Sequence, residues 1–152
     1  MKKCLMLVCF LAHQASADEM RTLCEQQANL VEFMMAVRKD GFARNGVEVE
    51  LQKRYPNAPA NYWQQPVSQH LLKFTYNIDG LKPAAAREYF FNVCLNEITD
   101  IDSPATSAAL FNVAKDCQQQ FDTDKAKIKA CVDTAAEPVL MAAWQAKPRA
   151  GE

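Results

Sequence analysis

Three aromatic side chains lie in one proline-containing segment and could together form a binding surface. Tyr55, Tyr62 and Trp63 belong to the run YPNAPANYW, which is interrupted at Pro56 and Pro59. Tyr and Trp supply rigid contact area, and both are enriched where proteins bind one another. We therefore predict a partner-binding loop here. The alternative interpretation is that Trp63 folds over the core as a lid.

Basic residues flank this segment in the sequence, namely Arg38, Lys39, Arg44, Lys53 and Arg54. The chain as a whole carries a net charge of −1, so such a group could mark a face for an acidic partner. A solvated surface of mixed charge is the alternative. The candidate binding residues are Arg44, Arg54, Tyr55, Tyr62 and Trp63.

His70 is the histidine best placed to act as a general base, because the other, His13, falls in an N-terminal segment treated below. A catalytic histidine needs a nucleophile and an orienting group. Ser68 lies two residues away, which on a helix is a different side. Motifs for serine hydrolases, nucleotide binding and zinc proteases are absent from the sequence. We expect no catalytic site, no cofactor and no enzyme.

Two aspartate pairs, Asp100/Asp102 and Asp122/Asp124, could suggest calcium binding. Neither has the ligand series or the glycine of an EF-hand loop. Both pairs precede expected helices, where aspartate commonly caps the first turn. We predict helix caps and no metal site.

Methionines at Met20, Met34, Met35 and Met141 could line a site for a soft metal or an apolar ligand. Their helical spacing favours core packing. A small apolar cavity is the alternative.

Four cysteines, Cys24, Cys94, Cys117 and Cys131, follow the N-terminal segment, which contains Cys4 and Cys9. Zinc-type spacing such as C-x-x-C is absent. Two helices that reverse direction at Asp124 would bring Cys117 and Cys131 level with each other. We predict disulfides Cys117–Cys131 and Cys24–Cys94, the second joining the first helix to the fourth.

Residues 1–17 have the three parts of a secretory signal peptide. Lys2 and Lys3 precede an apolar run over residues 4–12, and Ala15 and Ala17 form an Ala-x-Ala cleavage site. The run is shorter than the roughly 20 residues that span a membrane. We predict cleavage after Ala17 and export to the periplasm or the medium.

The remaining chain is predicted to be one helical domain over residues 18–146, with a disordered tail at 147–152. It contains no further apolar run long enough to cross a membrane. Loss of Lys2 and Lys3 makes it more acidic than the whole chain, and it has no basic run. Both features argue against nucleic acid as a partner.

Apolar periodicity and turn residues predict an all-α bundle of five to six helices stabilised by disulfides. We expect helices over 19–40, ending before Gly41, and over 46–54. Further helices begin at Pro66, at Pro83, after a Ser103 cap and after Asp124. Pro138 should kink or break the last one. The expected inward positions include Val67, Ala108 and Cys117.

The run from Cys24 through Arg38 and Gly41 to Tyr76 and Cys94 resembles a loose group of small, uncharacterised exported bacterial proteins. In that group an early cysteine precedes a helix ending in Arg-x-x-Gly or Arg-x-Gly. A helix containing tyrosine and a late cysteine follow. The resemblance covers residues 24–95 and implies export and a helical fold, with no assigned activity.

These observations favour an exported periplasmic protein-interaction module: an inhibitor, an immunity-type protein or an envelope accessory protein. The expected partner is another envelope or secreted protein. The alternative is a carrier of a small apolar ligand in a cavity of the bundle. The sequence leaves the oligomeric state open.

Overall fold

The computed structural model describes residues 3–59, 61–99, 101 and 103–147, with side chains from Ala17 onward. Within these residues there are helices and no strand. The elements are α1 (Lys3–Lys39), α2 (Arg44–Arg54), the 3-10 helix η1 (Tyr62–Gln64), α3 (Pro66–Asn77), α4 (Pro83–Ile98), α5 (Pro104–Phe121) and α6 (Lys125–Ala146). The prediction of an all-α, disulfide-stabilised bundle is confirmed.

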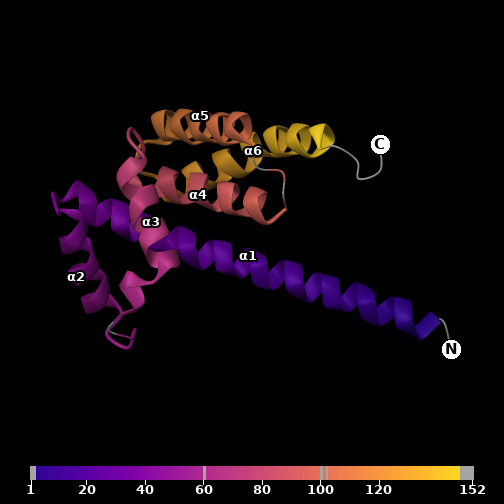
Figure 1. The fold of residues 1–152 in the computed structure, drawn as a ribbon. Coiled ribbons are helices and arrows are strands. Elements are labelled where there is room, and N and C mark those ends of the chain that lie inside the picture. The colour runs from indigo at the N-terminus through magenta and orange to yellow at the C-terminus, as the bar shows by residue number, and fades with distance from the viewer. Residues whose placement is uncertain (1–2, 60, 100, 102, 148–152) are drawn as a thin grey trace.

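Helix α1 is the element that the two parts of the fold share. It packs against α4 and also contacts α2 and α3, whereas α4, α5 and α6 pack on one another. Figure 1 shows α4, α5 and α6 grouped on one side, α2 at the far end, and the first turns of α1 extending beyond the other helices. The molecule therefore has a three-helix layer and an α2–η1–α3 layer, both resting on the second half of α1.

Helix α1 begins earlier than the sequence predicted. It starts at Lys3 rather than near residue 19, so it runs through the predicted cleavage site at Ala17. Its predicted end is confirmed, because the helix stops at Lys39 and Gly41 has a φ of +91°. That left-handed conformation favours glycine and closes the last turn.

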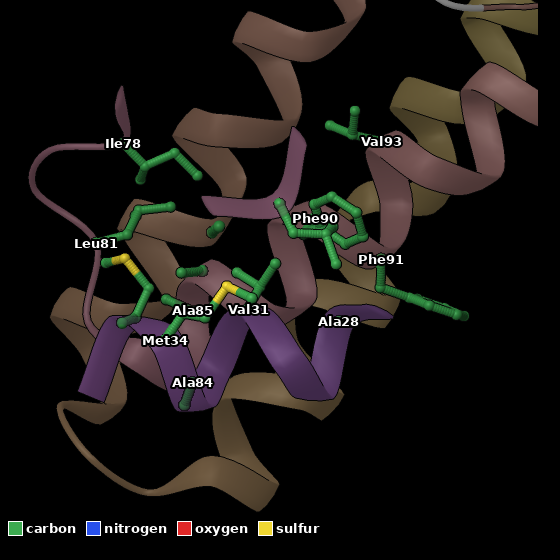
Figure 2. Close-up of a cluster of buried hydrophobic side chains, with 14 of the residues drawn as sticks. Ala28, Val31, Met34, Ile78, Leu81, Ala84, Ala85, Phe90, Phe91 and Val93 are labelled. Atoms are coloured by element: carbon green, nitrogen blue, oxygen red, sulfur yellow. The ribbon is translucent and has the colours of Figure 1, made fainter. Parts of the chain in front are cut away.

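The core forms where α1 faces α4. Ala28, Val31 and Met34 recur at three-residue intervals, so they lie on one face of α1. Figure 2 shows them beside Ala85 and Phe90 of α4. Small alanines let the two helices approach closely, and full burial of a side chain such as Met34 contributes about 1.5–3 kcal/mol.

Both predicted disulfides are present. Cys24 and Cys94 join α1 to α4 with their Cα atoms 5.7 Å apart. Cys117 and Cys131 join α5 to α6 with a Cα–Cα distance of 5.8 Å. The α5–α6 hairpin reverses between Phe121 and Lys125, so the two cysteines lie level as expected.

Two sequence signals set the ends of these helices. The Ser103 hydroxyl accepts a hydrogen bond from the Thr106 amide at 3.0 Å, and the Asp124 carboxylate accepts one from the Lys127 amide at 3.2 Å. Each satisfies a first-turn N–H group that has no partner within its helix. The predicted caps at Ser103 and Asp124 are confirmed, whereas Asp100 and Asp102 lie outside the described residues.

Helix α2 resolves an ambiguity of the sequence. Val47 and Leu51 are fully buried, whereas Val49 is 55% exposed. Residues four apart share a helix face, so this burial follows the helical period rather than the alternation of a strand. The predicted helix over 46–54 is confirmed, and it begins two residues earlier, at Arg44.

Several inward positions were predicted wrongly. Val67 is 57% exposed, and Ala108 is exposed as well. Ser68 and Thr75 occupy the buried face of α3 instead, because Ser68 donates to the Tyr62 carbonyl and Thr75 to the Leu71 carbonyl. These hydrogen bonds satisfy the two hydroxyl groups within the core.

The core positions predicted for two methionines, in α1 and α6, need correction. Met20 is 40% exposed and Met141 is 52% exposed, so only Met34 and Met35 pack in the core. Helix α6 continues through Pro138 to Ala146, so it does not break there, and the alternative of a kink stays a prediction. Of the predicted tail, residues 148–152 lie outside the described residues.

Candidate binding site

The predicted aromatic loop forms one wall of an open pocket of about 510 Å³. The opposite wall is the exposed side of α1. The lining residues are Gln26, Asn29 and Leu30 of α1, and Arg54, Tyr55, Pro56, Asn57, Ala58, Tyr62 and Trp63 of the loop and its flanking helices. Pockets of about 300–1,000 Å³ are the usual size for ligand sites. The structure thus gathers four of the five candidate residues at a single hollow.

Gln52 of α2 holds this loop in place from both ends. Its amide nitrogen donates to the Ala58 carbonyl at 3.4 Å, and its amide oxygen accepts from the Trp63 indole nitrogen at 3.0 Å. The Ala58 amide also donates to the Tyr55 carbonyl at 3.0 Å, closing a turn. The loop is therefore shaped before any partner arrives, which lowers the entropic cost of binding.

Trp63 supports the pocket from within. Its side chain is only 4% exposed, and its ring meets Tyr62 edge-on with centroids 4.9 Å apart. Tyr55 lies 5.8 Å from the same ring and is 37% exposed. The alternative reading of Trp63 as a lid on the core matches this burial. The aromatic surface accessible to a partner therefore comes from Tyr55 and Tyr62.

Arg54 stands at the rim of the pocket without an acidic partner in the described part of the chain. Its guanidinium carbon lies 5.2 Å from the ring centroid of Phe33 and 6.0 Å from that of Tyr55. A cation above an aromatic face is attracted by the ring quadrupole, which is negative over the face of the ring. This leaves the N–H groups of Arg54 available to an anionic ligand.

The other cations near the loop in sequence do not gather at the pocket. Arg44 lies ten residues before Arg54, about 15 Å along α2, and hydrogen-bonds to Gln69 of α3. Lys53 pairs with Glu50. Arg38 donates to the carbonyls of Thr75 and Ile78 at the end of α3. Arg44 was therefore wrongly grouped with the aromatic residues.

Sequence reasoning missed the wall that α1 contributes. Gln26 and Asn29 are exposed polar residues on a helix, a pattern that every solvated helix face has. Leu30 is half-buried and borders the hollow. No local signal distinguishes such residues, because the loop that covers them is distant in sequence.

His70 is exposed on α3. The neighbouring Ser68 hydroxyl is buried and donates to the Tyr62 carbonyl at 2.9 Å. Among the described residues there is no group of three or more His, Cys, Asp or Glu side chains arranged to hold a metal ion. In the same residues no helix is both long and apolar enough to cross a membrane.

A buried ion cluster joins α4 to the side of α1 that borders the pocket. Glu88 is 3% exposed and pairs with Arg87, which also pairs with Glu25 of α1. Burial raises the pKa of the Glu88 carboxyl above its ordinary value, although Arg87 opposes that shift. The cluster joins α1 to α4 and contacts the pocket wall, because the Arg87 guanidinium donates to the side-chain oxygen of Asn29 at 2.8 Å.

Comparisons of the chain with protein-family models, with curated proteins and with solved structures found no match. The resemblance of residues 24–95 to small exported bacterial proteins stays a prediction.

Proposed function

We propose that the protein is an exported, periplasmic protein-interaction module that holds a segment of a partner protein in the pocket beside α2. An inhibitor, an immunity-type protein or an envelope accessory protein would act in this way. The observation that carries the proposal is the preformed hollow of about 510 Å³ walled by Tyr55 and Tyr62, with Arg54 at its rim.

The chemistry of the walls supports a peptide as the ligand. Tyr rings give apolar contact, and the amide side chains of Gln26 and Asn57 can donate to and accept from a peptide backbone. A carrier of an apolar molecule would need a closed apolar cavity. This pocket is open and has amide and guanidinium groups in its walls, so it suits a peptide better than a lipid.

Export is supported by two independent features. Residues 2–17 have the charge, apolar run and Ala-x-Ala site of a signal peptide. Four cysteines form two disulfides, which persist in oxidising compartments such as the periplasm. The proposed partner is therefore another envelope or secreted protein.

Affinity capture tests the proposal. The full chain, tagged at its C-terminus, is expressed in its own host and isolated from the envelope fraction with whatever it has bound. We expect one dominant protein, recovered at least tenfold less with Tyr55→Ala because the exposed ring is lost. Met141→Ala is the matched control, since it removes an exposed apolar side chain of α6.

Capture that is unchanged by Tyr55→Ala would refute the role of the pocket. Equal losses with Tyr55→Ala and Met141→Ala would do the same. Circular dichroism of each variant confirms that the helix content is retained.

A further inference from the structure

The aromatic pocket is half of a longer groove. A second hollow, of about 600 Å³, lies against the same side of α1 and shares Asn29, Arg54 and Tyr55 with the first. Its remaining lining residues are Glu32, Phe33, Ala36, Pro83 and Lys125. Arg54 and Tyr55 therefore stand at the boundary between two hollows, with space for a ligand on either side.

The charges in this groove select an anionic ligand. None of the residues that line the first hollow is acidic, and Arg54 is its one cation. In the second hollow Glu32 is paired with Lys125, so these two charges offset each other. Arg54 is left as the unneutralised charge at the centre of the groove, in a chain whose overall charge is negative.

The planar guanidinium of Arg54 fits a carboxylate in particular. Two of its N–H groups can donate in parallel to the two carboxylate oxygens. The guanidinium carbon lies over the Phe33 ring, 5.2 Å from its centroid, and this contact favours one position of the charge before the ligand binds. An exposed lysine would provide charge without this geometry.

Space on both sides of Arg54 indicates where the carboxylate lies in the ligand. A terminal carboxylate ends its chain at the arginine and would fill one hollow only. The side chain of an internal Asp or Glu lets the chain continue in both directions. In an extended segment, residues two positions before and after the acid point to the same side, about 6.6 Å away along the chain.

We propose that the groove binds an extended internal segment of a partner protein in which Asp or Glu pairs with Arg54 and aromatic or proline residues two positions to either side fill the two hollows. This inference rests on the proposed function, because it names the partner segment that the same pocket would take.

The test is a selection of random heptapeptides displayed with both ends fused, against the immobilised full chain with its disulfides formed. We expect the enriched peptides to share a central acid with an aromatic residue or proline at the second position on each side. A fluorescent peptide of this pattern should bind about fivefold more tightly than its Glu→Gln counterpart, as expected for one exposed charge-assisted pair.

Variants assign that preference to one side chain. Arg54→Gln should abolish the difference between the Glu and Gln peptides, whereas Arg44→Gln should keep it. Arg44 is a matched control, because it belongs to the same helix and changes the net charge equally. Peptides that bind only with a free C-terminal carboxylate would overturn the inference in favour of a chain terminus.

Three further results would overturn the inference: enrichment of peptides without an acid, an acid preference that survives Arg54→Gln, or no enrichment. The first two leave the proposed function standing if binding still requires Tyr55. If no peptide is enriched and no protein is captured from the envelope, both proposals fail together.

Discussion

The two layers that rest on α1 are held together by different interactions. Both disulfides lie among α1, α4, α5 and α6. The segment from α2 to α3 has no cysteine, and its apolar side chains pack in the core. Hydrogen bonds between the loop that carries Trp63 and the side chains of Gln52, Ser68 and Gln69 add to this packing. The first layer, α4, α5 and α6 with the part of α1 on which they pack, is a disulfide-linked scaffold. The second keeps one loop in shape while its outer aromatic rings stay uncovered, which suits a binding surface.

Removal of a disulfide should have the largest effect. Closing a longer loop restricts the unfolded chain more, so replacing Cys24 and Cys94 by alanine should cost a little over about 4 kcal/mol of unfolding free energy. Replacing Cys117 and Cys131 should cost about 3 kcal/mol. Urea denaturation measures both values. A larger loss for the short loop would contradict this ranking.

Trp63→Ala should be next and should act on the other layer. Loss of a buried Trp ring lowers the unfolding free energy by about 3–5 kcal/mol. Because Trp63 borders an open pocket, the space it leaves is not a closed cavity, and we expect a value near about 3 kcal/mol. Trp144→Ala, at a position that is 58% exposed, should stay within about 0.5 kcal/mol of the parent.

Hydrogen exchange locates the damage of Trp63→Ala. Amide exchange should become faster in α2 and α3 and remain slow in α5 and α6, because the disulfide-linked scaffold does not depend on Trp63. A uniform increase over all helices would show that the two layers unfold as one unit.

The sequence predicted the scaffold better than the groove, for a physical reason. Helix caps, the Gly41 terminus and the cysteine register around Asp124 act over a few residues, so they can be read locally. Burial of Ser68 and exposure of Val67 depend on where η1 docks. A local sequence pattern does not indicate such contacts between residues that are distant in sequence.

The candidate site follows the same division. Tyr55, Tyr62 and Arg54 were recognisable because aromatic residues and an arginine meet in one proline-containing loop. The error at Arg44 arose because neighbours in sequence were assumed to be neighbours in space. Arg44 and Arg54 are in fact the first and last residues of α2, a helix of 11 residues, so they lie at opposite ends of it.

Ser103→Ala should have a smaller effect that stays in the scaffold. The substitution removes the hydroxyl that accepts a hydrogen bond from the Thr106 amide. Loss of such a cap lowers the unfolding free energy by about 1 kcal/mol. Lys115→Ala, at an exposed position of the same helix, is the control. Thermal unfolding compares the two. A Ser103→Ala protein as stable as its parent would mean that water replaces the cap without loss.

The pH dependence of stability distinguishes the ion cluster of the scaffold. The pKa of Glu88 is raised above its ordinary value of 4.5, chiefly by burial. As the pH rises, the unfolded chain therefore loses the Glu88 proton at a lower pH than the folded protein does. The stability present below pH 4.5 is lost as the pH rises through the folded pKa.

Glu88→Gln removes this loss, so its stability relative to the parent should grow as the pH rises above 4.5. Glu97→Gln, at an exposed position of the same helix, is the control for loss of one carboxylate. Denaturant midpoints at several pH values provide the measurement. Parallel profiles for Glu88→Gln and the parent would mean that Glu88 does not titrate differently on folding.

The most direct test of the account is photo-crosslinking in the host, with a photoreactive phenylalanine analogue at position 55 or position 144. Both positions carry exposed aromatic side chains, one at the groove and one on the scaffold helix α6. We expect a single crosslinked protein from position 55 and none from position 144. A partner crosslinked from position 144 and not from position 55 would contradict the claim that the loop beside α2 is the binding surface.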